Sequence, residues 1–202
     1  MQNCAGKEIK GVMSLYSATL LFGCEHFVDL ISKTDDLQLI RIYNTSCIFF
    51  SIASLEGRLN EFISIQILID IEKQVDELVN IRNKEKQLSF EDKWNLVNEI
   101  FNYRSWDNSK EPFQSFNILR SLRNELVHYK GEVLGKNVPP TKKIKGLLTA
   151  LNIESKSDFL EDDCSTWIDD LLKSKELALW IKKITINLNC EIGNFWKKNP
   201  YA

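Results

Sequence analysis

The sequence predicts an all-α protein, a bundle of packed helices, and three observations support this fold class. Apolar residues recur at the three- and four-residue spacing of a helix face through nearly the whole chain. No alternating run of β-branched residues is long enough to indicate a strand. Signals that start or stop helices, such as Ser89, Pro112 and the pair Pro139 and Pro140, fall between the apolar segments. We therefore expect helices that are joined by polar loops and packed on one another.

Two long helices are expected first. Apolar residues at helical spacing cover residues 12–31, and the polar stretch 32–36 is the expected loop after them. The second helix is expected over about 39–69, where the apolar residues lie close together on one face at about 100° per residue. Residues 71–81 either continue this helix or begin another one, and the pattern leaves both possibilities open.

The remaining helices are shorter, apart from the last. Ser89 is the expected N-cap of a helix that runs to about Tyr103, with Asp92 in the place of the capping-box acid. Pro112 suits the first turn of the next helix, which is expected to run to about residue 130 and to stop at Gly131. Three more helices are expected over 141–150, 165–172 and 174–197.

Composition and charge exclude several classes of protein. The 202 residues suffice for one domain with a sizeable core, and 44% apolar with 27% charged residues is typical of a globular protein. The formal net charge of -2 argues against a general binder of polyanions. A nucleic-acid site must therefore be local, and residues 120–145 offer one, with seven Lys or Arg against two Glu. Residues 154–173 have the opposite bias, which is most simply a solvated face.

Cysteines, histidines and hydropathy indicate the cellular compartment and bear on membrane association and metal binding. The five cysteines form no CxxC pair, which favours reduced thiols and a cytoplasmic protein. No apolar run approaches the roughly 20 residues that span a bilayer, so no membrane association is expected. The histidines are His26 and His128, and neither lies in a cluster with metal-ligand spacing. We therefore expect no metal and no cofactor.

The stretch LRNELVHYKG, residues 122–131, contains the polar residues that could do chemistry. On a helical wheel, Arg120, Asn124 and His128 form a stripe opposite the apolar face. Arg123 instead projects into the apolar arc, where a guanidinium is costly unless it is paired or reaches a pocket.

A partner for Arg123 is available on the second helix. Glu56 lies among apolar residues there, with Ile52 and Leu59 about one turn to either side. Two helices thus each place one charge on an apolar face, so we expect Glu56 and Arg123 to meet as a buried or half-buried pair. Asn60 or Asn124 is expected to satisfy the remaining hydrogen bonds of that pair.

His128 would lie in the last turn of its helix, just before Gly131. Carbonyl groups at a helix C-terminus favour the charged imidazolium, and an imidazole suits proton transfer near neutral pH. A single histidine is more often a surface or capping residue, so this position alone leaves both interpretations open.

The same residues resemble a known motif. Arg123, Asn124 and His128 in their LRN and VHY context are similar to the R-x4-6-H motif of the HEPN family of helical domains. The segment IASLEGRLNEF, with Glu56 and Asn60, resembles the long helix that packs against the motif helix in that family. The fold expected is therefore a helical bundle of HEPN type.

The resemblance covers about residues 39–131. The first helix and the residues after 131 lie outside it, so we expect a single HEPN-like domain over 1–202 in which 141–202 is a C-terminal helical extension. One departure from the family concerns its toxins that pair with nucleotidyltransferase antitoxins. Some of these have a tyrosine two positions after the histidine, whereas here Tyr129 follows directly and Lys130 takes that place. This departure argues against that particular pairing.

The resemblance implies a metal-independent endoribonuclease of toxin or defence type. A ribose 2′-hydroxyl would attack the adjacent phosphate of RNA at the interface of a homodimer, leaving a cyclic phosphate and a free 5′-hydroxyl. By position, His128 would transfer the proton, Arg123 would neutralise the transition state and Asn124 would orient the phosphate. Arg120 and Tyr129 are expected to support this site. Because Arg123 and His128 lie about 140° apart on an ideal helix, a second copy or an unwound helix end must complete it.

Two other functions stay open. The chain is alternatively a non-catalytic HEPN-fold module that binds a nucleotide, a nucleic acid or a protein partner such as an antitoxin. A second alternative is an unrelated helical interaction protein in which the R-x4-H spacing arises by chance. Tyr103 and Trp106, just before the motif helix, are either packing anchors or a platform on which bases stack.

Overall fold

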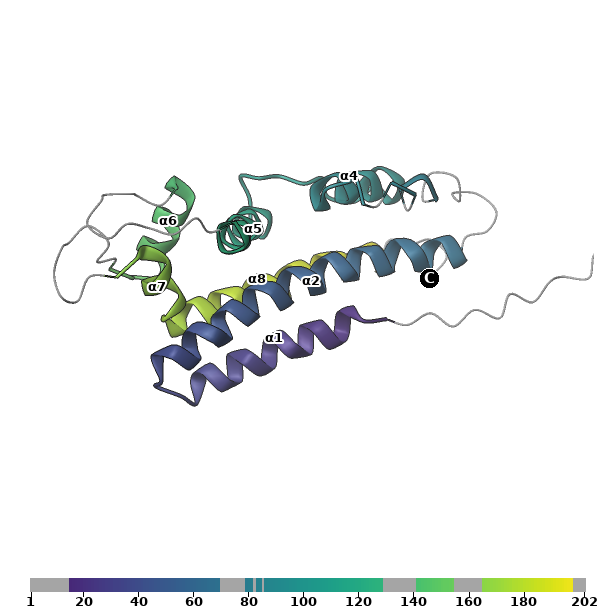
Figure 1. Cartoon of the computed structure of the whole chain (residues 1–202). Helices are drawn as coiled ribbons and strands as arrows, with labels where there is room; N and C mark the ends of the chain where they lie inside the picture. Colours follow the sequence, from purple (N-terminus) through teal and green to yellow (C-terminus); the bar gives the residue numbers. More distant parts are fainter. Residues whose placement is uncertain are drawn as a thin grey trace, which may run out of the picture.

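Three long helices form the base of the molecule (Figure 1). They are α1 (Ser17–Ser32), α2 (Leu37–Ile69) and α8 (Lys175–Lys197). α1 and α2 form an antiparallel hairpin, and α8 lies beside them and runs in the same direction as α2 (Figure 1). The computed structural model describes residues 15–69, 79–81, 83–84, 86–128, 141–154 and 165–197, in which all regular secondary structure is helical. The predicted all-α fold is therefore confirmed.

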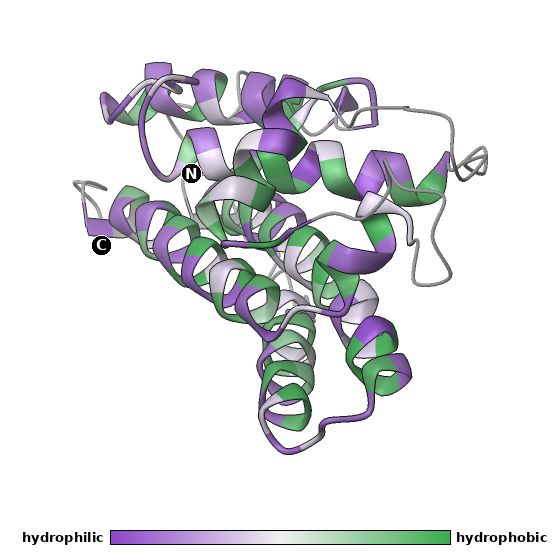
Figure 2. Ribbon diagram, turned by 90° about the vertical axis from the view of Figure 1, so that its left-hand side faces the viewer, coloured by the Kyte–Doolittle hydropathy of each residue, from purple (hydrophilic) through white to green (hydrophobic). Residues whose placement is uncertain are grey.

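A second layer covers one side of this base. It consists of α4 (Phe90–Phe101), which lies along α2, and α5 (Phe113–Val127), which crosses the long helices and is seen end-on in Figure 1. The short helices α6 (Lys142–Ala150) and α7 (Trp167–Leu172) lie at the end where α2 and α8 begin. Figure 2 shows hydrophobic and hydrophilic residues alternating along these helices, as amphipathic packing requires. In the described part of the chain, no helix combines the length and the hydropathy needed to cross a membrane.

The local helix signals act largely as the sequence predicts. Ser89 caps α4 in a full capping box, because its hydroxyl accepts from the N–H of Asp92 and the Asp92 carboxylate accepts from the N–H of Ser89. Pro112 is the N-cap of α5 rather than a residue of its first turn. α5 ends at Val127, earlier than expected, and Gly131 lies outside the described residues. Residues 71–78, where the second helix was expected either to continue or to be followed by another one, also lie outside them.

Buried amide and hydroxyl groups tie α2 to the C-terminal helices. The side-chain N–H groups of Asn44 donate to the carbonyl oxygens of Leu172, at 2.7 Å, and of Ser174, at 2.8 Å, where α7 ends and α8 is about to begin. Two turns further along, the Ser51 and Thr185 hydroxyl oxygens lie 2.5 Å apart between α2 and α8. Asn44, Ser51 and Thr185 are 0–1% exposed, so each bond satisfies a polar group that would otherwise be costly to bury.

The hairpin of α1 and α2 is fixed at the start of α1 and again near the middle of that helix. Glu61 of α2, which is 9% exposed, accepts from the N–H groups of Tyr16 and Ser17 and from the Ser17 hydroxyl. This carboxylate therefore caps the N-terminus of α1 from a neighbouring helix. Nearer the middle, α1 approaches α2 so closely at Gly23 that a Cβ there would lie 2.5 Å from the ring of Phe50.

An aromatic cluster holds α5 against the rest of the molecule. The ring centroids of Trp106 and Phe113 are 4.4 Å apart, and those of Trp94 in α4 and Phe195 in α8 are 4.7 Å apart. The Trp106 indole is 8% exposed and donates to the Asn108 side chain at 2.8 Å. Trp106 is therefore a packing anchor, and the idea that it offers its ring to RNA bases is wrong because its faces are already covered.

Candidate functional site

α5 is buried along most of its length and reaches the surface at its last turn. Phe113, Phe116, Leu119 and Leu122 are 0% exposed, so they fix the position and rotation of the helix. Val127, at the last position, is 50% exposed. The core therefore presents the C-terminal turn of α5, with the motif residues on it, to solvent.

His128 is the C-cap of α5. Its backbone lies outside the helical region, at φ -108° and ψ 23°, and its N–H donates to the carbonyl oxygen of Asn124 at 2.9 Å. The His128 side chain is exposed. Tyr129, which was expected to support the site, lies outside the described residues.

Arg123 and Asn124 lie about one turn before His128. The Asn124 side chain is exposed and that of Arg123 is half-buried. Within the described part of the chain, the guanidinium of Arg123 forms neither a hydrogen bond nor an ion pair. Its N–H groups therefore remain available to an anion, and a guanidinium binds phosphate oxygens in a bidentate fork.

Glu56 does not form the expected ion pair with Arg123. Both residues belong to the described part of the chain, and no contact within 4.0 Å joins their charged groups there. The reason lies in the rotation of α2. Glu56 follows Ile42 and Phe49 at seven-residue spacing, and these two side chains are 56% and 40% exposed. Glu56 thus lies at the margin of the buried face, where water can hydrate its charge.

Asn60, one turn beyond Glu56, binds a residue that the sequence interpretation did not single out. Its side-chain oxygen accepts from the Nζ of Lys93 in α4 at 2.9 Å. Lys93 is only 8% exposed, and in the described residues its ammonium group contacts no carboxylate. A signal was present, because Lys93 lies between Phe90 and Trp94 on the face of α4 that becomes buried.

Arg120 lies where α5 faces the first turn of α4. The pKa of Asp92 there is lowered, mainly because the Ser89 hydroxyl and N–H donate to its carboxylate, and in small part by the charge of Arg120. Arg120 is half-buried and precedes Arg123 by about one turn. The candidate site thus has two cationic side chains about one turn apart on α5, those of Arg120 and Arg123.

Exposed apolar side chains occur on the same elements as the candidate site. Ile42 and Phe49 lie on the face of α2 that also carries Glu56, and Val127 directly precedes His128. Exposed large apolar residues in register on a helix are typical of a contact surface.

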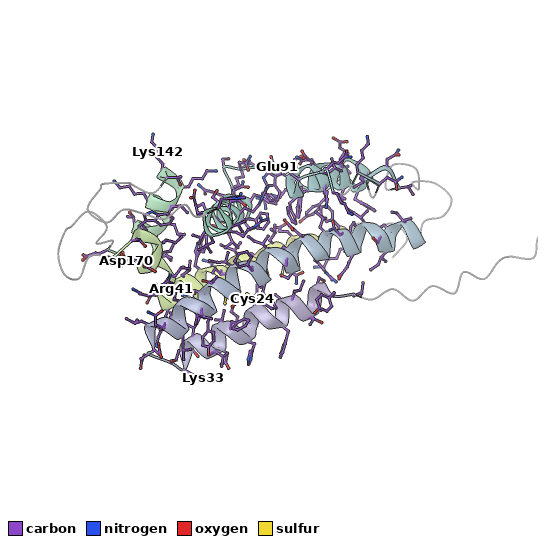
Figure 3. The ribbon with its side chains drawn as sticks, in the orientation of Figure 1. Cys24, Lys33, Arg41, Glu91, Lys142 and Asp170 are labelled. Carbon is purple, nitrogen blue, oxygen red and sulfur yellow. The ribbon has the colours of Figure 1, made fainter. Side chains whose placement is uncertain are left out.

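A cleft of about 780 Å³ opens beside the N-terminal half of α5. Its walls are α5 and the loop before it on one side and α6 on the other, with Trp180 of α8 also in its lining. Figure 3 labels Glu91 at the start of α4 and Lys142 at the start of α6, which are both lining residues. Sequence patterns could not predict this cleft, because its walls meet only in the folded chain.

No group of three metal-ligating side chains occurs among the residues that the structure describes. Comparison with known proteins gave no match to a family model, to a curated protein or to a solved structure.

Proposed function

We propose that this protein is a HEPN-like, metal-independent endoribonuclease of toxin or defence type that acts as a homodimer. One observation supports this proposal above the others. The surface turn of α5 carries an exposed imidazole, His128, together with a half-exposed guanidinium, Arg123, that no carboxylate in the described structure neutralises. A proton-transfer group and an available cation five residues apart suit attack on a phosphodiester.

The proposed reaction is internal transesterification of RNA. The neutral imidazole of one His128 removes the proton of a ribose 2′-hydroxyl, whose oxygen attacks the adjacent phosphorus. The bond from phosphorus to the 5′-oxygen breaks, and the imidazolium of the second copy protonates that oxygen. Arg123 neutralises the additional negative charge of the transition state, and Asn124 donates a hydrogen bond that orients the phosphate. The products are a 2′,3′-cyclic phosphate and a free 5′-hydroxyl.

A symmetric pair of chains fits this chemistry. Along an ideal helix, Arg123 and His128 point about 140° apart, so one chain presents them poorly to a single phosphate. A second copy brings another imidazole and another guanidinium to the same phosphodiester. The exposed Val127, directly before His128, supplies an apolar side chain at the motif, and Ile42 and Phe49 supply others on α2; such a dimer would bury side chains of this kind.

The test is cleavage of RNA in the presence of a chelator. We expect products with cyclic phosphate ends and expect His128→Ala to reduce the rate at least about 100-fold, which is the usual contribution of a proton-transfer residue. His26→Ala is the matched control, because His26 is the other exposed histidine and lies on α1. Unchanged helical content and unfolding midpoint would show that both variants fold. Equal cleavage by both variants would contradict the proposal.

A non-catalytic role is the second candidate. The cationic side chains of Arg120 and Arg123 would bind phosphate groups whether or not the bond is cut. An RNA-binding module of HEPN fold would therefore bind RNA, and Arg123→Gln would weaken that binding, while no cleavage occurs at any protein concentration. A protein partner such as an antitoxin would compete with RNA for the same surface.

A further inference from the structure

The cleft beside α5 has a lining that suits a single strand of nucleic acid. Its apolar floor includes Ile118, Leu147 and Trp180, and the indole of Trp180 is half-buried. Gln114 and Asn117 line the α5 wall. A flat aromatic surface next to amide groups can stack on a base and form hydrogen bonds to its edge.

Two lysines of α6 place positive charge on the cleft and form no ion pair within the described structure. Lys142 and Lys143 line it, both are exposed, and neither pairs with a carboxylate among the described residues. They belong to the basic stretch 120–145 of the sequence, most of which the R-x4-H motif does not use. Ammonium groups in this position suit the phosphates of a strand that passes over the cleft.

The two acidic residues of the lining are already engaged by neighbours. The Glu111 carboxylate accepts from the Ser115 hydroxyl at 2.7 Å, and that of Glu91 accepts from the Asn108 amide at 3.4 Å. Their remaining lone pairs can accept from ribose hydroxyls or from exocyclic amino groups of bases. The acids therefore disfavour a compact polyanion more than an RNA strand, which offers such donors together with its phosphates.

The α6 wall is bare at one point. Nothing lies within 4 Å of the position that a Cβ would take at Gly146, which lines the cleft. A ligand can therefore approach the backbone of α6 closely. The same position offers a test, because a side chain introduced there would fill the cleft without straining the protein.

We propose that this cleft is a subsite for single-stranded RNA, and that it holds a nucleotide of the same strand whose phosphodiester lies at His128. This inference rests on the proposed function. The strand would follow the outer face of α5, where the side chains of Asn117, Ser121 and Asn124 are polar and at least partly exposed. From Ile118 to His128 the helix rises about 15 Å, which corresponds to about four stacked nucleotides at about 3.4 Å each.

The first experiment measures cleavage against RNA length. Because a dinucleotide cannot reach from His128 to the cleft, we expect KM to fall as the RNA lengthens from two to about six nucleotides and then to level off. Lys142→Gln with Lys143→Gln should raise KM for a decamer about tenfold and leave the dinucleotide unchanged. Lys145→Gln is the control, since Lys145 is exposed on α6 but is not part of the lining. The inference would be overturned if KM does not change with RNA length, or if the double lysine variant raises KM for the dinucleotide as much as for the decamer.

The second experiment fills the cleft. Gly146→Glu introduces bulk and negative charge there, whereas Gly193→Glu makes the same change at an equally open position of α8. With a fluorescent decamer and the His128→Ala protein, we expect only the first variant to lose binding, about tenfold or more. The double lysine variant should also reduce the slope of log affinity against log salt, by about 0.7 for each phosphate that a lysine no longer neutralises.

The binding measurement separates the two proposals. A protein that binds the decamer through the cleft but cuts no RNA would refute the nuclease and leave the subsite supported. Cleavage of all lengths with no effect of the cleft variants would refute the subsite and leave the nuclease supported. A peptide of ten glutamate residues tests the other possible ligand. If Gly146→Glu weakens the binding of this peptide but not the binding of RNA, the cleft binds acidic peptides and the inference is overturned.

Discussion

The carboxylate of Glu61 should contribute more to stability than any other acid on α2. It accepts from the N–H of Tyr16 at 2.6 Å, from the N–H of Ser17 at 2.7 Å and from the Ser17 hydroxyl at 2.5 Å. Replacing it by alanine removes the acceptor for all three donors and leaves the positive end of α1 without a cap. The perturbation is thus confined to one helix start.

The magnitude follows from the exposure of each donor. Tyr16 is 62% exposed, so water can replace the carboxylate at its N–H with little loss. Ser17 is 4% exposed, and each of its two buried donors costs about 1–3 kcal/mol when it loses its partner. We therefore expect Glu61→Ala to lower the free energy of unfolding by about 2–4 kcal/mol. Glu61→Gln keeps one acceptor and should cost about half as much.

Urea unfolding, followed by circular dichroism, measures this difference. Glu56→Ala is the control on the same helix, because Glu56 has no partner in the described structure and its removal should change the free energy by less than about 0.5 kcal/mol. Equal effects of the two substitutions would refute the reasoning. A loss of about 3 kcal/mol for Glu56→Ala would indicate that Glu56 does form the buried pair with Arg123.

Two further predictions concern the hairpin and the capping box. Gly23→Ala should destabilise the protein by about 1–3 kcal/mol in the same urea assay, because the added methyl group meets the ring of Phe50, whereas Gly193→Ala, which meets nothing, should be neutral or stabilising. The lowered pKa of Asp92 means that its charged form is favoured in the folded state; its contribution is therefore present above the ordinary aspartate pKa and is lost as the pH falls through the lowered value. Asp92→Asn should accordingly flatten the loss of stability in acid, and an unchanged acid profile would contradict the bonds from Ser89.

The helices themselves could be predicted because their signals are local. Ser89 and Asp92 form their capping box within one turn, and the periodicity of α2 is visible along its own residues. The end of α5 was expected too late, at about residue 130, because a glycine is the usual sequence signal for a helix end, whereas the backbone already leaves the helical region at His128. The packing role of Trp106 could be recognised only from the fold, because the aromatic residues that cover its ring come from α4 and α5.

For the candidate site too, some features could be predicted from the sequence and others depend on the fold. That Arg123, Asn124 and His128 share one helix end follows from their spacing alone. Among the residues that the structure describes, Lys93 and not Arg123 reaches the polar groups of α2. This outcome depends on how α2, α4 and α5 are rotated against one another. A helical wheel gives the direction of a side chain relative to its own helix and says nothing about the neighbouring one.

The sequence by itself determined the helical class, most helix boundaries and the stretch that carries the motif, because hydrogen bonds within a helix join residues at most a few positions apart. Only the tertiary structure decided which acid of α2 caps a neighbouring helix, and where α5 and α6 enclose a cleft. Those outcomes depend on crossing angles that the whole core sets together, since close packing allows each helix a narrow range of rotations against its neighbours.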